Sequence, residues 1–210
     1  MQAIIYTKYG GPDQLHPAAI AQPVPRKNEL LIKVHTASIN SWDWDLLRGK
    51  PFLVRLLGGL TRPKHQVLGA DIAGIVESVG SDIKSFRPGD AVFGDIAGAG
   101  FGGFAEYAKA PEHLLAKIPE GMSMDQAAAM PQAGLLALQG LRYKKPLSAG
   151  QHLLINGAGG SVGTLALQYA KHMGAMVTCV DKEEKFATLR SLGADHLVDY
   201  RKEDYPARGI

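Results

Sequence analysis

The stretch over residues 153–171 constrains this chain more than any other, because a strand pattern, a tight loop and a helix pattern follow one another directly. The apolar residues 153–155 give way to four glycines within seven positions: Gly157, Gly159, Gly160 and Gly163. Glycines let a backbone approach a pyrophosphate closely, and the free N–H groups at a helix N-terminus favour its negative charge. The stretch is therefore predicted to bind a dinucleotide.

The segment that follows favours this interpretation over a plain structural turn. A strand-like run over residues 175–180 ends at Asp181, which lies 24 residues after Gly157. An acid at about that distance, at the tip of the second strand, can accept hydrogen bonds from the adenosine ribose hydroxyls. A helix pattern over residues 183–192 and a third strand beginning at residues 197–198 continue the alternating order.

The first 122 residues differ in character and are predicted to form a mostly-β domain. Strand candidates separated by glycine and proline turns cover residues 2–6, 29–34, 72–79 and 91–93. Short strands at this spacing favour a small barrel or sandwich. One segment inside this region is expected to be helical, with Asn40 or Ser41 as its N-cap and Gly49 at its end.

The pattern turns helical at Ser123 and then becomes α/β. Ser123 and Gln126 have the spacing of a capping box, and a second helix is expected from Pro131 to about residue 143. We therefore predict a mixed fold with two domains. Residues 1–122 would form the mostly-β domain, and residues 123–210 the first half of a dinucleotide-binding domain.

Composition narrows the classes of function. The chain has 210 residues, of which 46% are hydrophobic and 20% charged, so two domains can each form a core. Its net charge of +3 is small and its basic residues are scattered among acids, which predicts neither a nucleic-acid partner nor a membrane surface. The N-terminus lacks a signal-peptide pattern, and the single cysteine, Cys179, fits a reducing compartment. A cytoplasmic protein is the expectation.

Metal and acyl-transfer chemistry receive little support from the residues. A catalytic zinc ion needs three protein ligands and a structural one needs four. The chain offers one cysteine and seven histidines, and no two histidines are spaced three or four residues apart. No metal site is expected. A serine nucleophile is not expected either, because Ser161 lies in the predicted phosphate loop, where a small donor is needed.

Several motifs in the same order make the chain resemble the zinc-independent medium-chain dehydrogenase/reductase superfamily, and within it the quinone oxidoreductase and enone reductase branch. These motifs are residues 40–43 with Arg48 and Gly49, then 68–80, 88–93, 102–107, 127–141, the glycine loop, 191–195 and 199–200. The resemblance covers essentially all 210 residues. It implies a GroES-like N-terminal domain joined to a Rossmann domain, with the active site in the cleft between them.

The resemblance also implies roles for individual residues. Asn40 would lie beside the nicotinamide and the substrate, and Asp43 would support its loop. The pyrophosphate would be held by Gly157, Gly160, Ser161, Val162 and Gly163, and the adenosine end would be bordered by Lys185 and Tyr200. In zinc-using members a Gly-His-Glu triplet supplies ligands where this chain has Gly69, Ala70 and Asp71.

The implied activity is hydride transfer from NADPH or NADH to a quinone, an enone or a related activated carbonyl compound, without zinc. Asp181 would repel the 2′-phosphate of NADPH, whereas Lys182 and Lys185 can neutralise it, so the choice of cofactor stays open. A homodimer is compatible with the sequence but not specified by it. The alternative is a noncatalytic dinucleotide-binding or interaction protein, or an inactive fragment of the reductase.

The C-terminal end of the sequence carries one further expectation. A doubly wound domain of six strands requires about three more β-α units of roughly thirty residues each. The chain is therefore expected to be truncated at its C-terminus and to hold only half of its dinucleotide-binding domain.

Overall fold

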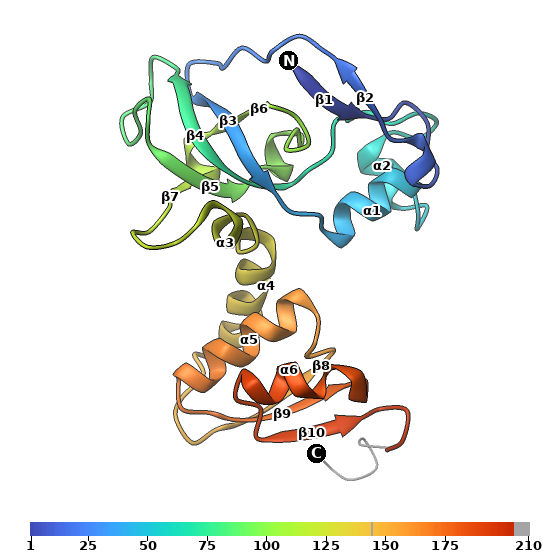
Figure 1. Ribbon diagram of the computed structural model, residues 1–210, viewed down its shortest axis with the longest axis vertical. Helices are drawn as coiled ribbons and strands as arrows, with labels where there is room; N and C mark the ends of the chain where they lie inside the picture. Colours follow the sequence, from blue (N-terminus) through green and yellow to red (C-terminus); the bar gives the residue numbers. More distant parts are fainter. Residues whose placement is uncertain (144, 204–210) are drawn as a thin grey trace. The chain divides into compact units, whose positions relative to one another are not determined.

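The computed structural model describes residues 1–143 and 145–203, and the chain divides into two compact units, Met1–Gln132 and Ala133–Ile210 (Figure 1). Each unit has its own apolar core. The predicted domain boundary after residue 122 and the division after Gln132 lie on opposite sides of the short helix α3 (Met124–Ala128). The predicted mixed fold class, with a mostly-β first unit and a partial parallel α/β sheet in the second, is confirmed.

The first unit is built on a five-stranded antiparallel sheet with the order β6-β3-β4-β5-β7. Its strands are β3 (Glu29–Ala37), β4 (Asp71–Val79), β5 (Ala91–Asp95), β6 (Tyr107–Pro111) and β7 (Ala116–Lys117). Alternate residues of β3, Leu30 and Ile32, are fully buried and form one core cluster with Ile72 and Val92. Residues two apart in a strand point to the same face, so Leu30 and Ile32 place that face of the sheet against this core. A separate antiparallel pair consists of β1 (Gln2–Ile5) and β2 (His16–Ala19).

Two helices of the first unit begin at the N-cap residues that the sequence predicts. Helix α1 (Ser41–Arg48) has Asn40 as its N-cap, and Gly49 closes it in the left-handed conformation with φ +59°. Helix α3 has the predicted capping box between Ser123 and Gln126. The remaining short helical segments are α2 (Val54–Gly58) and the 3₁₀ turns Pro12–Gln14, Ala97–Ala99 and Glu112–Leu114.

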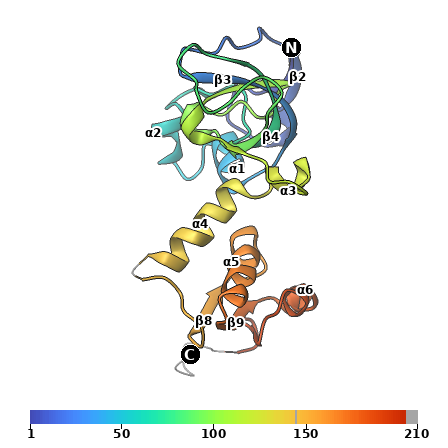
Figure 2. The same ribbon diagram turned by 90° about the vertical axis from the view of Figure 1, so that its left-hand side faces the viewer.

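The second unit holds a three-stranded parallel sheet with the order β10-β9-β8. Along the chain its elements are β8 (His152–Asn156), α5 (Ser161–His172), β9 (Met176–Asp181), a 3₁₀ turn (Glu183–Lys185), α6 (Phe186–Ser191) and β10 (His196–Asp199). Both crossovers run in the same direction, so right-handed connections place α5 and α6 on one face of the sheet. Leu167 of α5 and Leu189 of α6 share a core cluster with Val177 of β9. Figure 2 shows α5 and α6 next to β9.

Helix α4 (Pro131–Arg142) connects the end of the first unit to the second. Within the described ranges, no helix combines the length and the apolar character needed to cross a bilayer.

Candidate functional site

The glycine loop is held against the neighbouring strand by its backbone. It leaves β8 at Gly157, whose φ of +76° requires the left-handed region that glycine favours. The N–H groups of Gly157 and Ala158 donate to the carbonyl oxygen of Val180 in β9, at 2.9 and 3.2 Å. A hydrogen bond of 3.1 Å from Gly160 N to Gly157 O closes the turn just before α5 begins. The predicted strand–loop–helix order is confirmed.

Gly163 lets the first turn of α5 pack directly on this loop. A Cβ atom at Gly163 would lie 2.6 Å from Ala158 Cα and 2.6 Å from Gly157 O. Both contacts are with backbone atoms that cannot rotate away, so only glycine fits without moving the loop or the helix.

The loop presents hydrogen-bond donors that a bound anion can use. The first N–H groups of a helix have no partner inside the helix. In α5 these belong to Ser161, Val162 and Gly163, and none of them has a partner among residues 1–143 and 145–203. The N-cap residue is Gly160, which has no side chain to satisfy them. The cradle therefore fits a pyrophosphate, and the phosphate-binding role of these residues stays a prediction.

Asp181 fastens the glycine loop to the end of β9. Its side chain is buried, and Oδ2 accepts a 2.7 Å hydrogen bond from Gly159 N. Oδ1 accepts from Lys182 N at 2.8 Å and lies 3.3 Å from the Lys185 ammonium. Burial acts to raise the pKa of Asp181, but these hydrogen bonds and the ammonium charge outweigh it and hold the pKa below its ordinary value. The carboxylate is thus ionised beside the predicted ribose position.

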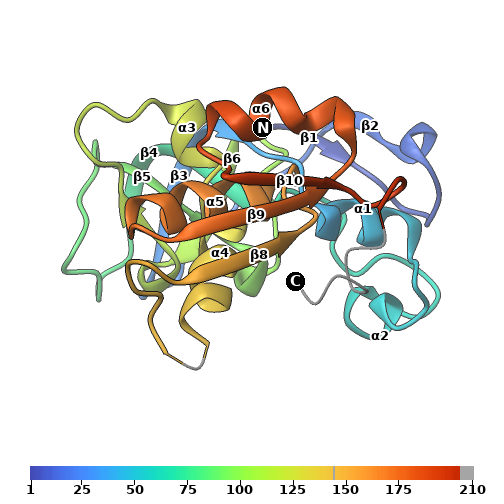
Figure 3. The same ribbon diagram turned by 90° about the horizontal axis from the view of Figure 1, so that it is seen from below.

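The other residues predicted for the adenosine end lie at the same edge of the sheet. The strands are parallel and Asp181 pairs with Asp199, so the carboxyl ends of β9 and β10 lie together (Figure 3). Tyr200 directly follows β10 and is half-exposed, and Lys182 and Lys185 are exposed beside Asp181. The structure therefore brings the predicted cofactor-binding residues of the second unit to one edge, as parallel strands require.

In the first unit, Asp43 joins the start of α1 to the segment that precedes β4. Oδ2 accepts from Asn40 N at 2.9 Å, and Oδ1 accepts from Gly69 N at 2.9 Å. The side chain is 2% exposed, and burial raises its pKa despite these hydrogen bonds. Asp43 therefore fixes the backbone at Asn40, which is the geometry that its predicted supporting role needs.

Replacing Asp43 with alanine is expected to lower the free energy of unfolding by roughly 2–4 kcal/mol, because the N–H groups of Asn40 and Gly69 lose their acceptor. Urea unfolding monitored by circular dichroism measures this loss. The matched control is Asp45→Ala on the same helix, which removes only a partly exposed pair with Arg48 and is expected to cost less than about 1 kcal/mol. Equal losses in the two variants would contradict the tether.

Asp71 belongs to this site although sequence reasoning assigned it no role beyond the triplet with Gly69 and Ala70. It is 1% exposed, and Oδ2 accepts from Gln132 N at 3.0 Å. Among the described residues Oδ1 has no hydrogen-bond partner. Burial raises the pKa of Asp71 to about 6, with the charge of Asp95 acting in the same direction. The sequence signal that could have identified Asp71 is its place as an acid at the first position of a long apolar strand.

The raised pKa of Asp71 makes the stability of the first unit depend on pH. Because the folded pKa of about 6 exceeds the ordinary 3.8, folding favours the protonated form. This stabilisation is complete below about pH 4 and is lost as the pH rises through about 6. We expect Asp71→Asn to remove this pH dependence, so that its stability relative to the wild type rises by up to about 3 kcal/mol between pH 4 and pH 7.5. Urea unfolding across that range is the measurement, and parallel curves would contradict the assignment.

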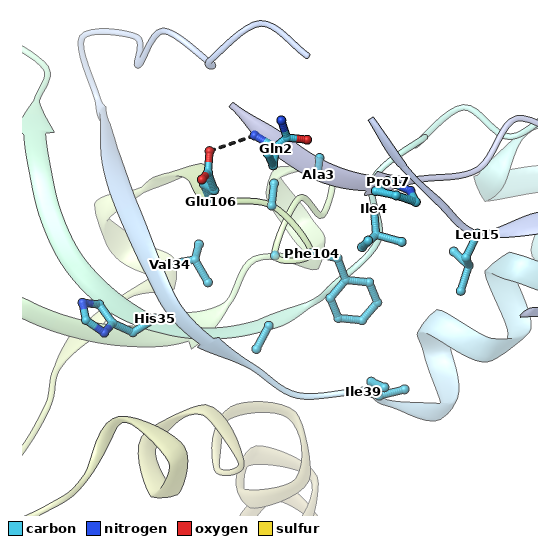
Figure 4. Close-up of a pocket in the computed structure, with 13 residues that line it drawn as sticks. Gln2, Ala3, Ile4, Leu15, Pro17, Val34, His35, Ile39, Phe104 and Glu106 are labelled. Carbon is cyan, nitrogen blue, oxygen red and sulfur yellow. Dashed lines mark hydrogen bonds between the residues drawn. The ribbon is translucent and has the colours of Figure 1, made fainter. Parts of the chain in front are cut away.

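An open apolar pocket of about 570 Å³ lies near the segment that carries Asn40 (Figure 4). Ile4, Pro17, Val34, Ile39 and Phe104 are among the residues that line it. Figure 4 also shows the 2.8 Å hydrogen bond from Gln2 N to the Glu106 carboxylate at its edge. The lining suits an apolar molecule better than a charged one.

Metal-ligating residues do not gather in the described part of the chain. Across residues 1–143 and 145–203, no group of three or more His, Cys, Asp or Glu side chains is arranged to hold a metal ion.

Two family models match the sequence. The alcohol dehydrogenase GroES-like domain matches residues 26–120, and the zinc-binding dehydrogenase model matches residues 161–209. The chain is 37% identical over 210 residues to the chloroplast envelope quinone oxidoreductase homolog of Arabidopsis thaliana, covering 96% of this chain and 61% of that protein. It is also 37% identical over 214 residues to the NADPH-dependent alkenal/one oxidoreductase of the same plant, covering 97% and 53%.

The comparison with solved structures agrees with these sequence matches. The quinone oxidoreductase of Coxiella burnetii superposes with a TM-score of 0.89 at 35% identity, covering 99% of this chain and 65% of that one. The chain spans 53–61% of the length of the curated relatives that it matches.

Proposed function

Because the chain belongs to the medium-chain dehydrogenase/reductase superfamily, on its quinone oxidoreductase and enone reductase branch, we propose that the whole protein is an NAD(P)H-dependent reductase of quinones, enones or related activated carbonyl compounds. The observation that carries this proposal is the glycine loop. Its first helical turn offers the N–H groups of Ser161, Val162 and Gly163 to an anion, and Asp181 holds the loop in place.

The residues of the second unit would bind and orient the dinucleotide. The α5 donors and Gly157 and Gly160 would hold the pyrophosphate, Asp181 would accept from the adenosine ribose, and Lys185 would border the adenosine end. When bound, the dihydronicotinamide supplies the hydride that reduces an electrophilic carbon. The relative named NADPH-dependent supports NADPH, and the ionised Asp181 supports NADH.

The residues of the first unit would serve the substrate. Asn40 would lie beside it, and Asp43 would fix the backbone of Asn40 through the 2.9 Å hydrogen bond. The apolar pocket close to Ile39 suits the hydrocarbon part of a quinone or an enone. Metal-free chemistry is part of the proposal, since Ala70 stands at the position where zinc-using members have a histidine.

The test is oxidation of NADH and NADPH by the 210-residue chain with a panel of small quinones and enones, followed by loss of absorbance at the nicotinamide band. Turnover with at least one cofactor is the expected result. Dinucleotide binding without turnover would favour the alternative, a noncatalytic dinucleotide-binding chain or an inactive fragment of the reductase. Failure of both cofactors to bind would contradict the assigned role of the glycine loop.

A further inference from the structure

The segment over residues 46–70 differs in charge from the rest of the chain. It contains no aspartate or glutamate, and its basic residues are Arg48, Lys50, Arg55, Arg62 and Lys64. Elsewhere the acidic and basic residues are interspersed, so the net charge of +3 for the whole chain does not reveal this local excess of positive charge. The segment therefore concentrates positive charge around the short helix α2.

The same segment exposes large apolar side chains. These side chains, which we name the α2 patch, are Phe52, Leu53, Leu56, Leu57 and Leu60, and their exposed fractions lie between 57% and 69%. Val54 and Gly58 are buried and attach α2 to its unit, so the neighbouring leucines face outward. Figures 1 and 3 both show α2 on the side of the unit away from β5. A cluster of this kind is unusual on a protein surface that contacts only water.

Three of the five basic residues around the α2 patch are free to meet an anionic partner. Arg48 pairs with Asp45, and Arg55 donates to Gly49 O and stacks on Tyr9. The other three basic residues of the segment are exposed, and none of them forms an ion pair within the described ranges: Lys50, Arg62 and Lys64.

We propose that the α2 patch docks on the surface of a membrane that contains anionic lipid. Leucine and phenylalanine side chains enter the headgroup region, while neighbouring lysines and arginines contact lipid phosphates. A second copy of the chain fits less well, because a two-fold contact through this patch would bring like charges together. The net charge of the whole chain predicted no contact with a membrane surface. The proposal departs from that prediction because of the exposed apolar and basic side chains around α2.

The experiment is co-sedimentation of the full chain with phosphatidylcholine vesicles, with and without phosphatidylglycerol. We expect binding to the anionic vesicles only, and its loss at high salt. The double variant Leu53→Ser with Leu56→Ser is expected to weaken binding at least about tenfold. Lys50→Gln and Arg62→Gln are each expected to weaken it about fivefold.

Matched controls replace residues of the same type outside the patch. Val24, which is 79% exposed, is replaced by serine, and the exposed Lys84 by glutamine; neither change should alter binding. Thermal unfolding confirms that each variant is folded.

Several results would overturn the proposal. The first is the absence of vesicle binding. The second is binding that does not depend on phosphatidylglycerol, and the third is binding that the patch variants and the control variants weaken equally. Light scattering tests for self-association of the chain. If the chain self-associates but does not bind vesicles, and the Leu53→Ser and Leu56→Ser changes abolish the self-association, the patch binds a second copy instead. None of these results depends on turnover, so they are separable from failure of the proposed reductase activity.

Discussion

Replacing Gly163 with alanine is expected to raise the Kd for a nicotinamide dinucleotide by at least about 100-fold, a loss of roughly 2.7 kcal/mol of binding free energy. The new Cβ atom would meet Ala158 Cα and Gly157 O at 2.6 Å, so the loop and the first turn of α5 must separate. That separation misdirects the N–H groups of Ser161 and Val162, on which the proposed pyrophosphate contact depends. The same overpacking is expected to lower stability by about 1–3 kcal/mol.

Two further alanine variants separate the effect on binding from the effect on folding. At Gly140 in α4 a Cβ atom meets nothing within 4 Å, so Gly140→Ala is expected to leave binding unchanged. At Gly160 the nearest atom would be 3.4 Å away, an ordinary contact, so stability should hold while a bound pyrophosphate would be crowded. Titration of cofactor fluorescence measures the Kd of all three variants. An unchanged Kd for Gly163→Ala would contradict the proposed role of the loop.

The glycine loop and the capped helices could be predicted because their signals are local. Gly157 and Gly163 lie six positions apart, and the Asn40 and Gly49 caps are likewise close along the chain. The strand–turn–helix order follows from such short-range rules without knowledge of the tertiary fold.

The remaining features depend on contacts between residues that are distant in sequence. Asp71 acquires its pKa of about 6 because the folded unit buries it, and its hydrogen-bond partner Gln132 lies 61 positions later in the sequence. The tie between Gly159 and Asp181 requires β9 to lie beside β8. The exposure of Leu56 likewise depends on which side of α2 packs against the rest of its unit. A helix of five residues is too short for a hydrophobic periodicity to indicate that side.

Replacing Asp181 with serine is expected to shift the ratio of cofactor affinities toward NADPH by about tenfold or more. Hydrogen bonds and the Lys185 ammonium keep the pKa of Asp181 low, so the wild-type side chain is charged at neutral pH. A carboxylate about 4 Å from a 2′-phosphate costs several kcal/mol at the effective dielectric constant that applies near a protein surface. Serine removes that repulsion and frees the Lys185 ammonium, now 3.3 Å from Asp181 Oδ1, to approach the phosphate.

The ratio is the decisive quantity, because Asp181 has a second role. Serine also weakens the 2.7 Å tie to Gly159 N, and the loosened loop is expected to bind both cofactors less tightly by a similar factor. Adding Lys185→Met to Asp181→Ser separates the two effects: it should return the ratio toward NADH while leaving the affinity for NADH nearly unchanged. If the ratio for Asp181→Ser equals that of the wild type while both affinities fall, Asp181 serves only to hold the loop and does not face the ribose.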